Sequence, residues 1–201
     1  MDKIVTIKII AGKFKGKILN ARILPHTRPT KAILKESVFN TIAPFIKDKV
    51  FIEAFAGYGS MGFEALSRGA KRVIFIEKNA ESFAILQKNI SLFESEKGKI
   101  LAENADSFAI LRQERSIIDS GDILYFDPPF GEEFYNQIFA SLEAKLTRNS
   151  PLKVQNLQSK MLIFEHSTKF TMPNAIAEIP LQKAKKFGRS SVSYYFRHDF
   201  C

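Results

Sequence analysis

A short segment near the middle of the chain, Asp127-Pro128-Pro129-Phe130, combines a carboxylate, a rigid turn and an aromatic ring. It follows an apolar run at 123–126 that predicts a buried strand of a parallel sheet. Two consecutive prolines end that strand, because proline has no N–H for the sheet and its φ is fixed. The carboxylate can accept hydrogen bonds from an amino group while Phe130 stacks on a flat ring, which together describe recognition of a nucleobase. The alternative is a plain strand-ending turn, since Asp and Pro are ordinary turn residues.

A glycine-rich segment upstream supplies a second motif. An apolar strand runs into Gly57, Gly59 and Gly62, which have the G-x-G-x-x-G spacing, and then into a helix for which Ser60 is a candidate N-cap. Glycines at this spacing allow φ above zero and let the backbone approach a ligand closely. The next apolar strand ends at Glu77, at the distance from the glycines where an acid bonds a ribose hydroxyl. The complete unit predicts a cofactor that contains adenosine.

Both NAD and S-adenosylmethionine fit this unit, and two acids favour the second. Glu53 lies in the strand before the glycines, where a carboxylate can receive the cationic methionine end of the cofactor. Asp106 ends the turn Asn104-Ala105-Asp106 after a third strand and can bond the adenine amino group. The alternative roles are a carboxylate at the sheet edge for Glu53 and a helix N-cap for Asp106. For Asp106 both roles can hold together.

Composition limits the class of protein. A chain of 201 residues suits one compact domain with a small appendage. No apolar stretch approaches the roughly 18 residues that a membrane helix needs, and the amino-terminal residues alternate like a strand rather than a signal peptide. The single cysteine, Cys201, cannot form an internal disulfide, and the spacing of His26, His166 and His198 matches no metal site. We therefore expect a cytoplasmic protein without a metal.

The net charge of +9 is distributed unevenly. Residues 1–47 carry ten Lys or Arg against two acids, residues 48–182 carry fifteen against eighteen, and residues 183–201 carry five against one. A slightly acidic middle with two basic ends predicts that the ends hold a polyanion, most simply RNA. The alternative is a basic surface kept for solubility. The residues predicted to bind RNA are Lys13, Lys15, Lys17, Arg28, Lys185 and Lys186.

The order of predicted elements indicates the fold. Strands are predicted at 3–10, 16–23, 49–54, 72–77, 99–102, 122–126 and 160–165, with a terminal hairpin of 175–185 and 190–197. Helices are predicted at 30–43, 60–68, 79–92, 106–114 and 132–146, the first capped by Thr30 and with an apolar face of Ile33, Leu34, Val38 and Ile42. Alternating strands and helices predict an α/β fold with a doubly wound, mostly parallel sheet and an antiparallel edge. The stretches 112–121 and 149–159 carry no motif.

At this point the motifs match a known family over nearly the whole chain. They are Ile9-Ile10-Ala11-Gly12, Lys15-Gly16-Lys17, Thr27-Arg28-Pro29-Thr30, Lys35-Glu36, Phe39-Asn40, Phe55-Ala56-Gly57-Tyr58-Gly59-Ser60, Glu64 to Ala70 and Asp127-Pro128-Pro129-Phe130. The chain resembles the RsmD family of bacterial 16S ribosomal RNA guanine-N2 methyltransferases. The Asp/Asn-Pro-Pro-aromatic motif alone is shared by methyltransferases of adenine-N6, cytosine-N4, guanine-N2 and protein glutamine. The Arg28-Pro29-Thr30 element, followed by Lys35-Glu36 and Phe39-Asn40, is what favours the RsmD family among them. Glu53 departs from the aspartate expected more often there.

The resemblance implies a Rossmann-like class I methyltransferase domain at 48–201 behind a basic extension at 1–47, which would lie on the RNA and cofactor side. It implies S-adenosylmethionine as the cofactor and 16S ribosomal RNA, within a partly assembled small subunit, as the partner of a monomer. The expected catalytic residues are Asp127, Pro128, Pro129 and Phe130. The expected cofactor-binding residues are Arg28, Thr30, Glu53, Phe55, Ala56, Gly57, Gly59, Ser60, Glu77, Lys78, Ala105 and Asp106.

Other functions stay open on the sequence alone. An adenine-N6 or protein-glutamine methyltransferase is the nearest alternative. An NAD-dependent oxidoreductase explains the glycines and Glu77 but leaves the Asp127 motif and the basic ends unexplained. A non-catalytic RNA-binding module explains the charge but not the cofactor unit. Glu165 and His166 close the fifth strand of the sheet, where they are candidates for the rim of the pocket as well as for a structural role.

Overall fold

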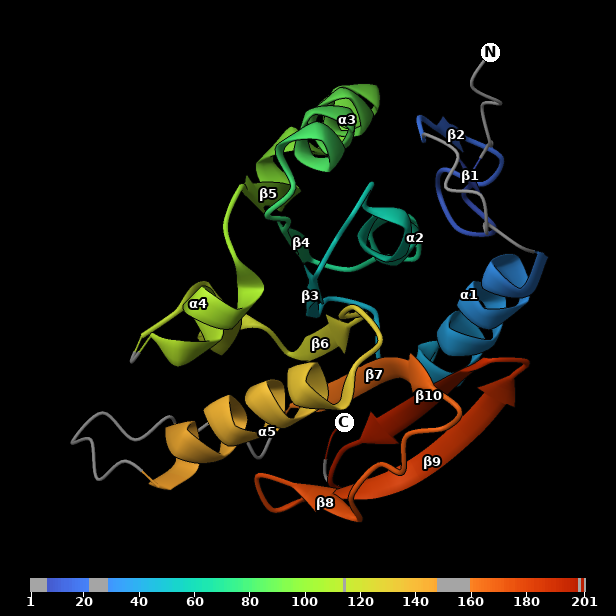
Figure 1. The fold of residues 1–201 in the computed structure, drawn as a ribbon. Coiled ribbons are helices and arrows are strands. Elements are labelled where there is room, and N and C mark those ends of the chain that lie inside the picture. Colours follow the sequence, from blue (N-terminus) through green and yellow to red (C-terminus); the bar gives the residue numbers. More distant parts are fainter. Residues whose placement is uncertain (1–6, 22–28, 114, 148–159, 199, 201) are drawn as a thin grey trace.

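One mixed β-sheet organises the molecule (Figure 1). The computed structural model describes residues 7–21, 29–113, 115–147, 160–198 and 200. The eight strands lie in the order β5-β4-β3-β6-β7-β10-β9-β8. The parallel strands are β3 (Val50–Ala54), β4 (Arg72–Ile76), β5 (Ile100–Glu103), β6 (Ile123–Phe126) and β7 (Met161–Ser167), and the antiparallel ones are β8 (Ala175–Ile176), β9 (Ile179–Phe187) and β10 (Ser190–Tyr195). This architecture confirms the predicted doubly wound, mostly parallel fold.

The direction of winding reverses beside β3. From β3 the chain moves outward through β4 to β5, and it then returns to place β6 on the opposite side of β3. In open α/β sheets the crevice outside the carboxyl ends of the strands at such a reversal is where ligands bind. Here that crevice is bordered by the segments that follow β3 and β6.

Helices cover both faces of the sheet (Figure 1). The helices α1 (Pro29–Ile42), α2 (Ser60–Ser67) and α3 (Ala80–Ile90) contribute to one apolar cluster, and α4 (Ser107–Arg112) and α5 (Glu132–Thr147) contribute to the other. Alternate strand residues point to opposite clusters, so that Phe51 and Tyr125 lie on the α1 side while Ile52 and Phe126 lie on the α5 side. Two 3₁₀ segments, η1 (Ser91–Lys99) and η2 (Ile117–Ser120), connect α3 to β5 and α4 to β6.

Two details of the predicted elements are wrong. The predicted strand 175–185 is divided, because Ala177 and Glu178 have φ of 49° and 61° and form a two-residue turn between β8 and β9. The predicted apolar face of α1 is confirmed for Leu34, Val38 and Ile42, which are buried, and is wrong at Ile33. Ile33 is 60% exposed, whereas Lys35 is buried together with Leu34 on the inner side. The remaining predicted strands and helices of the sheet begin and end within about three residues of those observed.

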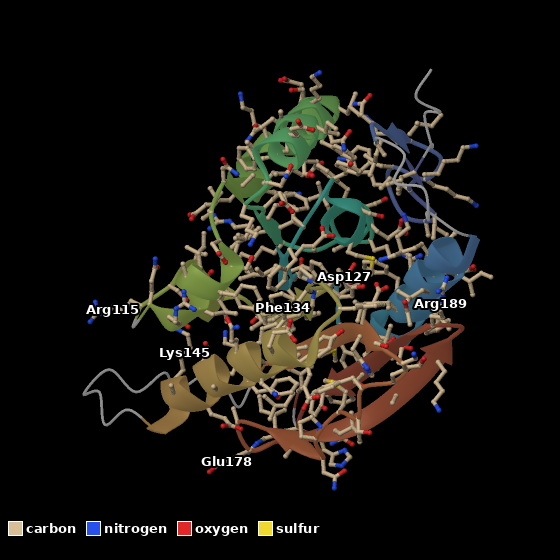
Figure 2. All side chains as sticks on the ribbon, viewed as in Figure 1. Arg115, Asp127, Phe134, Lys145, Glu178 and Arg189 are labelled. Atoms are coloured by element: carbon tan, nitrogen blue, oxygen red, sulfur yellow. The ribbon has the colours of Figure 1, made fainter. Side chains whose placement is uncertain are left out.

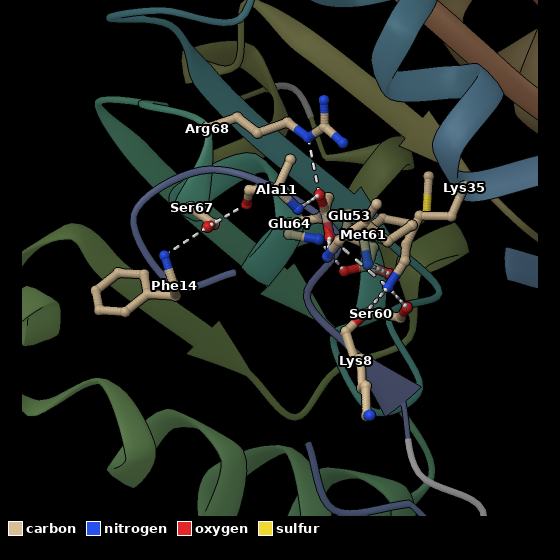
Figure 3. A network of polar contacts seen from close by, with 12 residues as sticks. Lys8, Ala11, Phe14, Lys35, Glu53, Ser60, Met61, Glu64, Ser67 and Arg68 are labelled. Atoms are coloured by element: carbon tan, nitrogen blue, oxygen red, sulfur yellow. Dashed lines mark hydrogen bonds and ion pairs between the residues drawn. The ribbon is translucent and has the colours of Figure 1, made fainter. Parts of the chain in front are cut away.

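The amino-terminal segment is fastened to α2 (Figure 3). Its strands β1 (Ile7–Lys8) and β2 (Ile18–Leu19) pair antiparallel, which confirms a hairpin. The predicted strands are too long, because 9–10, 16–17 and 20–21 are not strand, and 3–6 and 22–23 lie outside the described residues. The fully buried Glu64 carboxylate of α2 accepts hydrogen bonds from the backbone N–H groups of Ile10 (2.7 Å) and Ala11 (3.0 Å) and from Arg68 Nε (2.8 Å). Gly12, at φ +84°, passes so close to α2 that a Cβ would lie 1.9 Å from the Ser67 carbonyl oxygen.

No helix in the described parts of the chain is both long enough and apolar enough to cross a bilayer. Among the same residues, no group of three or more His, Cys, Asp or Glu side chains is arranged to hold a metal ion.

Candidate active site

Two carboxylates lie side by side at the carboxyl ends of β6 and β7. Phe126 of β6 pairs with Phe164 of β7, so Asp127 and Glu165, each one residue further along, continue the same register. Tyr125 and Ile163 face the cluster that α1 covers, and because side chains alternate along a strand, Asp127 and Glu165, two residues further on, project to the same face. The Tyr125 hydroxyl donates a hydrogen bond to Glu165 Oε2 at 3.0 Å. The predicted catalytic acid therefore has a second, buried acid as its neighbour.

A lysine from the first turn of α1 joins the two acids. Lys31 Nζ lies 3.0 Å from Asp127 Oδ2 and 3.1 Å from Glu165 Oε1. The exposed fractions fall inward, from 56% for the Lys31 side chain through 29% for Asp127 to 2% for Glu165. Asp127, at the centre of Figure 2, lies between the end of β6 and the helices around it. Lys31 is thus the most accessible of the three charged groups and Glu165 the least.

The charges of this triad change the proton affinity of Asp127. Burial raises the pKa of Asp127, the neighbouring Glu165 carboxylate raises it further, and the Lys31 ammonium opposes both, with a result of about 6. Burial alone would lower the pKa of Lys31, but Asp127 and Glu165 outweigh it and hold that pKa above its ordinary value. At neutral pH Asp127 is thus an ionised hydrogen-bond acceptor beside a permanent cation.

The rest of the predicted catalytic motif frames this carboxylate. Pro128 is buried, whereas Pro129 and Phe130 are exposed. The Phe130 side chain is 52% exposed, which is unusual for a large apolar residue and leaves its ring free to contact a planar group. The carboxylate, the turn and the open ring are therefore arranged as the sequence predicts for holding a base with an amino group.

The glycine turn after β3 borders open space at one position. Gly57 has φ of +54°, and a Cβ added there would meet no atom within 4 Å. Gly59, at φ +83°, and Gly62 serve packing instead, because a Cβ would lie 2.6 Å from the Phe63 ring and 2.3 Å from the Phe75 ring, respectively. Of these three glycines, only Gly57 has open space in the direction in which a Cβ would point.

Glu77 holds this turn in place from the end of β4. Its Oε2 accepts a hydrogen bond from the Gly57 N–H at 2.6 Å, and its Oε1 accepts one from the Asn79 N–H at 2.7 Å. Each carboxylate oxygen can accept more than one hydrogen bond, so Glu77 can order the turn and still accept from a ribose hydroxyl.

Glu53 points at the amino end of α2. Its Oε1 accepts from the Met61 N–H at 3.2 Å and its Oε2 from the Gly62 N–H at 2.7 Å, and burial raises the pKa of Glu53 to about 8. The N-cap of α2 is Gly59 in the left-handed conformation, so the predicted capping role of Ser60 is wrong. The Ser60 hydroxyl instead accepts from Lys35 Nζ at 3.3 Å.

An aromatic surface lies beside Asp106, the residue predicted to bind adenine. Asp106 caps α4 by accepting from the Phe108 N–H at 2.8 Å, yet its side chain is 43% exposed and lies 3.8 Å from Lys78 Nζ. The Phe55 ring meets Phe108 edge-on at 5.0 Å, and Phe134 stacks on Phe108 at 5.7 Å. Partly buried Phe55 and a half-exposed carboxylate fit an adenine ring with its amino group.

The predicted neighbours of the cofactor have mixed placements. Ala56 is buried and donates its N–H to the Ile76 carbonyl, which fixes the start of the glycine turn. Ala105 packs against the cluster on the α5 side. Arg28 lies outside the described residues, and of Thr30 the structure describes only its place in the first turn of α1.

The lysines predicted to bind RNA differ in how free they are. Lys13 pairs with Glu96, and Lys17 donates to the Leu92 carbonyl with its ammonium 4.8 Å from the centre of the Phe93 ring. Lys185 donates to Ser37 Oγ at 2.9 Å. Lys15 and Lys186 are exposed. Lys15 and Lys186 are therefore more accessible to phosphates than the three lysines whose ammonium groups already contact other residues of the chain.

Sequence reasoning missed Lys31 and left Glu165 undecided. A lysine in the first turn of a helix is an ordinary surface residue, and nothing local indicates that its ammonium reaches the ends of two strands about a hundred positions later. The one signal for Glu165 was its place at the end of an apolar strand next to the Asp127 strand.

A reversal of strand order, a glycine turn closed by an acid and an Asp-Pro-Pro-Phe motif at the adjacent strand define a class I methyltransferase. A family model described as "Conserved hypothetical protein 95" matches residues 7–196. "Ribosomal RNA small subunit methyltransferase D" of Haemophilus influenzae is 33% identical over 161 residues, which cover 78% of this chain and 82% of that one. The chain therefore belongs to the RsmD family, which confirms the resemblance seen in the sequence.

Other comparisons agree over the full length. "Putative rRNA methyltransferase YlbH" of Bacillus subtilis is 26% identical over 190 residues, covering 94% of this chain and 98% of the relative. The solved structure of "Putative methyltransferase yhhF from Escherichia coli" superposes with a TM-score of 0.76 at 28% identity and covers 96% of this chain and 98% of that one. The amino-terminal segment and the terminal antiparallel strands thus belong to the shared fold.

Proposed function

We propose that this protein transfers a methyl group from S-adenosylmethionine to the exocyclic N2 amine of a guanine in 16S ribosomal RNA. The observation that carries the proposal is the Asp127 carboxylate, ionised at neutral pH and placed at the strand reversal beside an exposed Phe130. Relatives named as small-subunit ribosomal RNA methyltransferases support RNA as the substrate.

The residues that would hold the cofactor surround the glycine turn. Glu77 would accept from the ribose hydroxyls, and Asp106 would accept from the adenine amino group between Phe55 and Lys78. Glu53 lies at the amino end of α2, next to the place of the methionine moiety, with Ala56, Gly57, Gly59, Ser60 and Ala105 forming the walls. The expectation for Arg28 and Thr30 is carried over from the family motif. The bound cofactor supplies an electrophilic methyl group on a sulfonium, so the transfer needs no metal.

The protein's task is to position a weak nucleophile. The lone pair of the guanine amine is delocalised into the ring, and it becomes available when acceptors hold both N–H bonds. Asp127 would accept one of these hydrogen bonds, and the Pro128 carbonyl would accept the other. The positive charge that would develop on N2 as it takes the methyl group from the sulfonium would be stabilised by Asp127, and the N2 proton would then pass to solvent water. Phe130 stacks the extruded base, worth about 1–3 kcal/mol.

The basic ends would grip the RNA away from the reacting base. The exposed Lys15 and Lys186 lie on the two basic segments and carry this part of the proposal together with Lys13, Lys17, Arg28 and Lys185. We further propose that the division into a basic extension at 1–47 and a catalytic domain at 48–201 reflects this use. The proposed substrate is a partly assembled small subunit, met in the cytoplasm by a monomer of this protein.

Adenine-N6 or protein-glutamine methylation is the competing assignment, since the Asp127 motif serves those reactions too. The test is incubation of the purified protein with labelled S-adenosylmethionine and small subunits that lack the modification, followed by mass analysis of the digested RNA and protein. The proposal requires label in N2-methylguanosine. Label in N6-methyladenosine or in methylglutamine would replace it with the competing assignment, and a protein that binds NAD but transfers no methyl group would be an oxidoreductase.

A further inference from the structure

The Glu165 carboxylate has no role in the reaction described above, although it lies at the base of the site. Its side chain is 2% exposed. The Tyr125 hydroxyl occupies Oε2, while Oε1 is buried and accepts no hydrogen bond from the described part of the chain. Buried carboxylate oxygens are costly unless donors reach them. Glu165 therefore presents a fixed acceptor on the side of Asp127, and the Lys31 ammonium, 3.1 Å from Oε1, is its charge partner.

Lys31 compensates for this acceptor from outside. Its ammonium lies within 3.1 Å of both carboxylates, but its side chain is 56% exposed and belongs to a different element. Because the four-carbon stem of lysine is flexible, the ammonium can move toward solvent when the donors of a ligand replace it at the carboxylates. Where an ammonium sits between two acids, the N–H donors of a ligand can take its place.

The edge of guanine offers the matching donors. The N2 amine that Asp127 is proposed to hold is adjacent to N1, which carries a hydrogen in guanine. Adenine has a lone pair at N1 beside its N6 amine, and cytosine has one at N3 beside its N4 amine. Of these bases only guanine places two neighbouring N–H donors toward two neighbouring carboxylates.

We propose that Glu165 binds the N1–H of the target guanine and so determines the base that this enzyme methylates, with Lys31 occupying that donor position in the free protein. This inference rests on the proposed function. A rigid strand carries Glu165, and Tyr125 fixes its orientation, as a specificity-determining acceptor requires. The adjacent His166 points to the other face, where its Nε2 lies 2.9 Å from Ser193 Oγ.

The experiment uses small subunits partly assembled on a synthetic 16S RNA, in which the mapped target guanosine is replaced by 2-aminopurine riboside, which keeps the N2 amine but has a lone pair at N1. Wild-type protein should prefer guanosine over 2-aminopurine by roughly 10- to 100-fold in kcat/KM, since one charge-assisted hydrogen bond is lost and a buried carboxylate then faces a lone pair. In Glu165→Gln the amide N–H can meet that lone pair, so the preference should fall to about threefold or less. A ratio between two substrates is insensitive to partial unfolding, which lowers both rates alike.

Lys31→Met is the matched control, because it removes the ammonium that lies between the two acids but keeps the Glu165 carboxylate. Its preference for guanosine should equal that of the wild type. A Glu165→Gln protein that retains the wild-type preference would overturn the inference while leaving the proposed function intact. If the preference for guanosine were lost in Lys31→Met but kept in Glu165→Gln, Lys31 would select the base, and the inference about Glu165 would again be overturned. Wild-type protein that methylates neither substrate would contradict the proposed function itself.

Discussion

At the scale of single residues, the site consists of acids whose neighbours decide what each can do. Asp127 is ionised and partly open, Glu165 is buried beside Tyr125, and Glu77 is engaged by the backbone of the glycine turn. Three carboxylates with similar intrinsic chemistry thus have different roles, because burial and hydrogen-bond partners differ.

Asp127→Ala should abolish turnover while leaving the cofactor bound. The substitution removes the acceptor for the amine, and losing one such electrostatic contact costs at least about 100-fold in rate. Asp127→Asn should retain some activity, because its carbonyl oxygen still accepts one hydrogen bond. Single-turnover methylation and calorimetry with S-adenosylhomocysteine measure the two effects separately. Wild-type rates in Asp127→Ala would remove Asp127 from the mechanism.

The pH dependence of the reaction should report the protonation of Asp127. With a pKa of about 6, Asp127 loses its ability to accept as pH falls below that value, so kcat/KM should drop about tenfold per pH unit there and stay level above it.

The contribution of Asp127 to the free energy of unfolding should change with pH in the opposite direction to the rate. A carboxyl whose folded pKa is raised binds more protons folded than unfolded, so its contribution becomes less favourable as pH rises from about 4 to 6. Asp127→Asn should lack the inflection in rate, and its persistence in that variant would assign the titration to another group.

Glu77→Ala should weaken cofactor binding by about 1.5–3 kcal/mol, the value of one charge-assisted hydrogen bond. The loss includes loosening of the turn that Glu77 holds through the Gly57 N–H. Calorimetric titration with S-adenosylhomocysteine measures it, and exposed Glu94→Ala is the control, with unchanged affinity expected. Equal affinities for Glu77→Ala and wild type would exclude Glu77 from the cofactor site.

The sequence predicts the positions of those site residues that lie directly after a predicted strand. Asp127, Gly57 and Glu77 stand at the ends of strands that apolar runs predict, so their positions follow from the fold class alone. Lys31 reaches its partners through tertiary packing of α1, and no periodicity in its own segment encodes that contact.

At the scale of elements, the amino-terminal segment depends on one buried acid of α2. Glu64 accepts from two backbone N–H groups of that segment and from Arg68, with Lys35 Nζ at 3.8 Å (Figure 3). Lys35 is buried beside Glu64 and donates to the Lys8 carbonyl at 2.8 Å, and apolar spacing alone could not predict that a lysine lies on the inner face of α1. A polar contact across elements overrode the hydrophobic pattern.

Glu64→Ala should destabilise the protein by about 3–5 kcal/mol, because it leaves two backbone N–H groups and Arg68 Nε without their acceptor and buried Lys35 without its counter-ion. Glu64→Gln should cost less, since the amide keeps the shape and one acceptor oxygen. Urea unfolding measures both, and Glu94→Ala, on the surface of η1, should change stability by no more than about 0.5 kcal/mol. Stability of Glu64→Ala within that range would show that the segment is held by other contacts.

At the scale of the whole molecule, charge separates the acidic middle of the sequence from its basic ends. The sequence predicted this division, but it could not show which lysines are used within the fold. Lys13 and Lys17 contact η1 and its neighbours, and these contacts join segments far apart in the chain. Only the structure distinguishes them from the exposed Lys15 and Lys186.

Charge reversal of Lys15 and Lys186 together should weaken RNA binding and flatten its dependence on salt. Each lost phosphate contact should reduce the slope of log K against log salt concentration by about 0.7–0.9 units. Filter binding across a salt series measures the slope, and calorimetry checks that cofactor affinity is unchanged. Lys71→Glu, an exposed residue at the amino end of β4, is the control, and its slope should match the wild type. An unaltered slope in the double variant would make these lysines solubility features.

The central claim is N2-methylation of a guanine in 16S ribosomal RNA through Asp127. It is tested most directly by mass analysis of nucleosides from purified small-subunit RNA of cells that lack this protein. We predict that one N2-methylguanosine per subunit is lost, that it returns when the wild-type gene is restored, and that it stays absent with Asp127→Ala. An unchanged N2-methylguanosine content, or the loss of a methylated adenosine in its place, would contradict the claim.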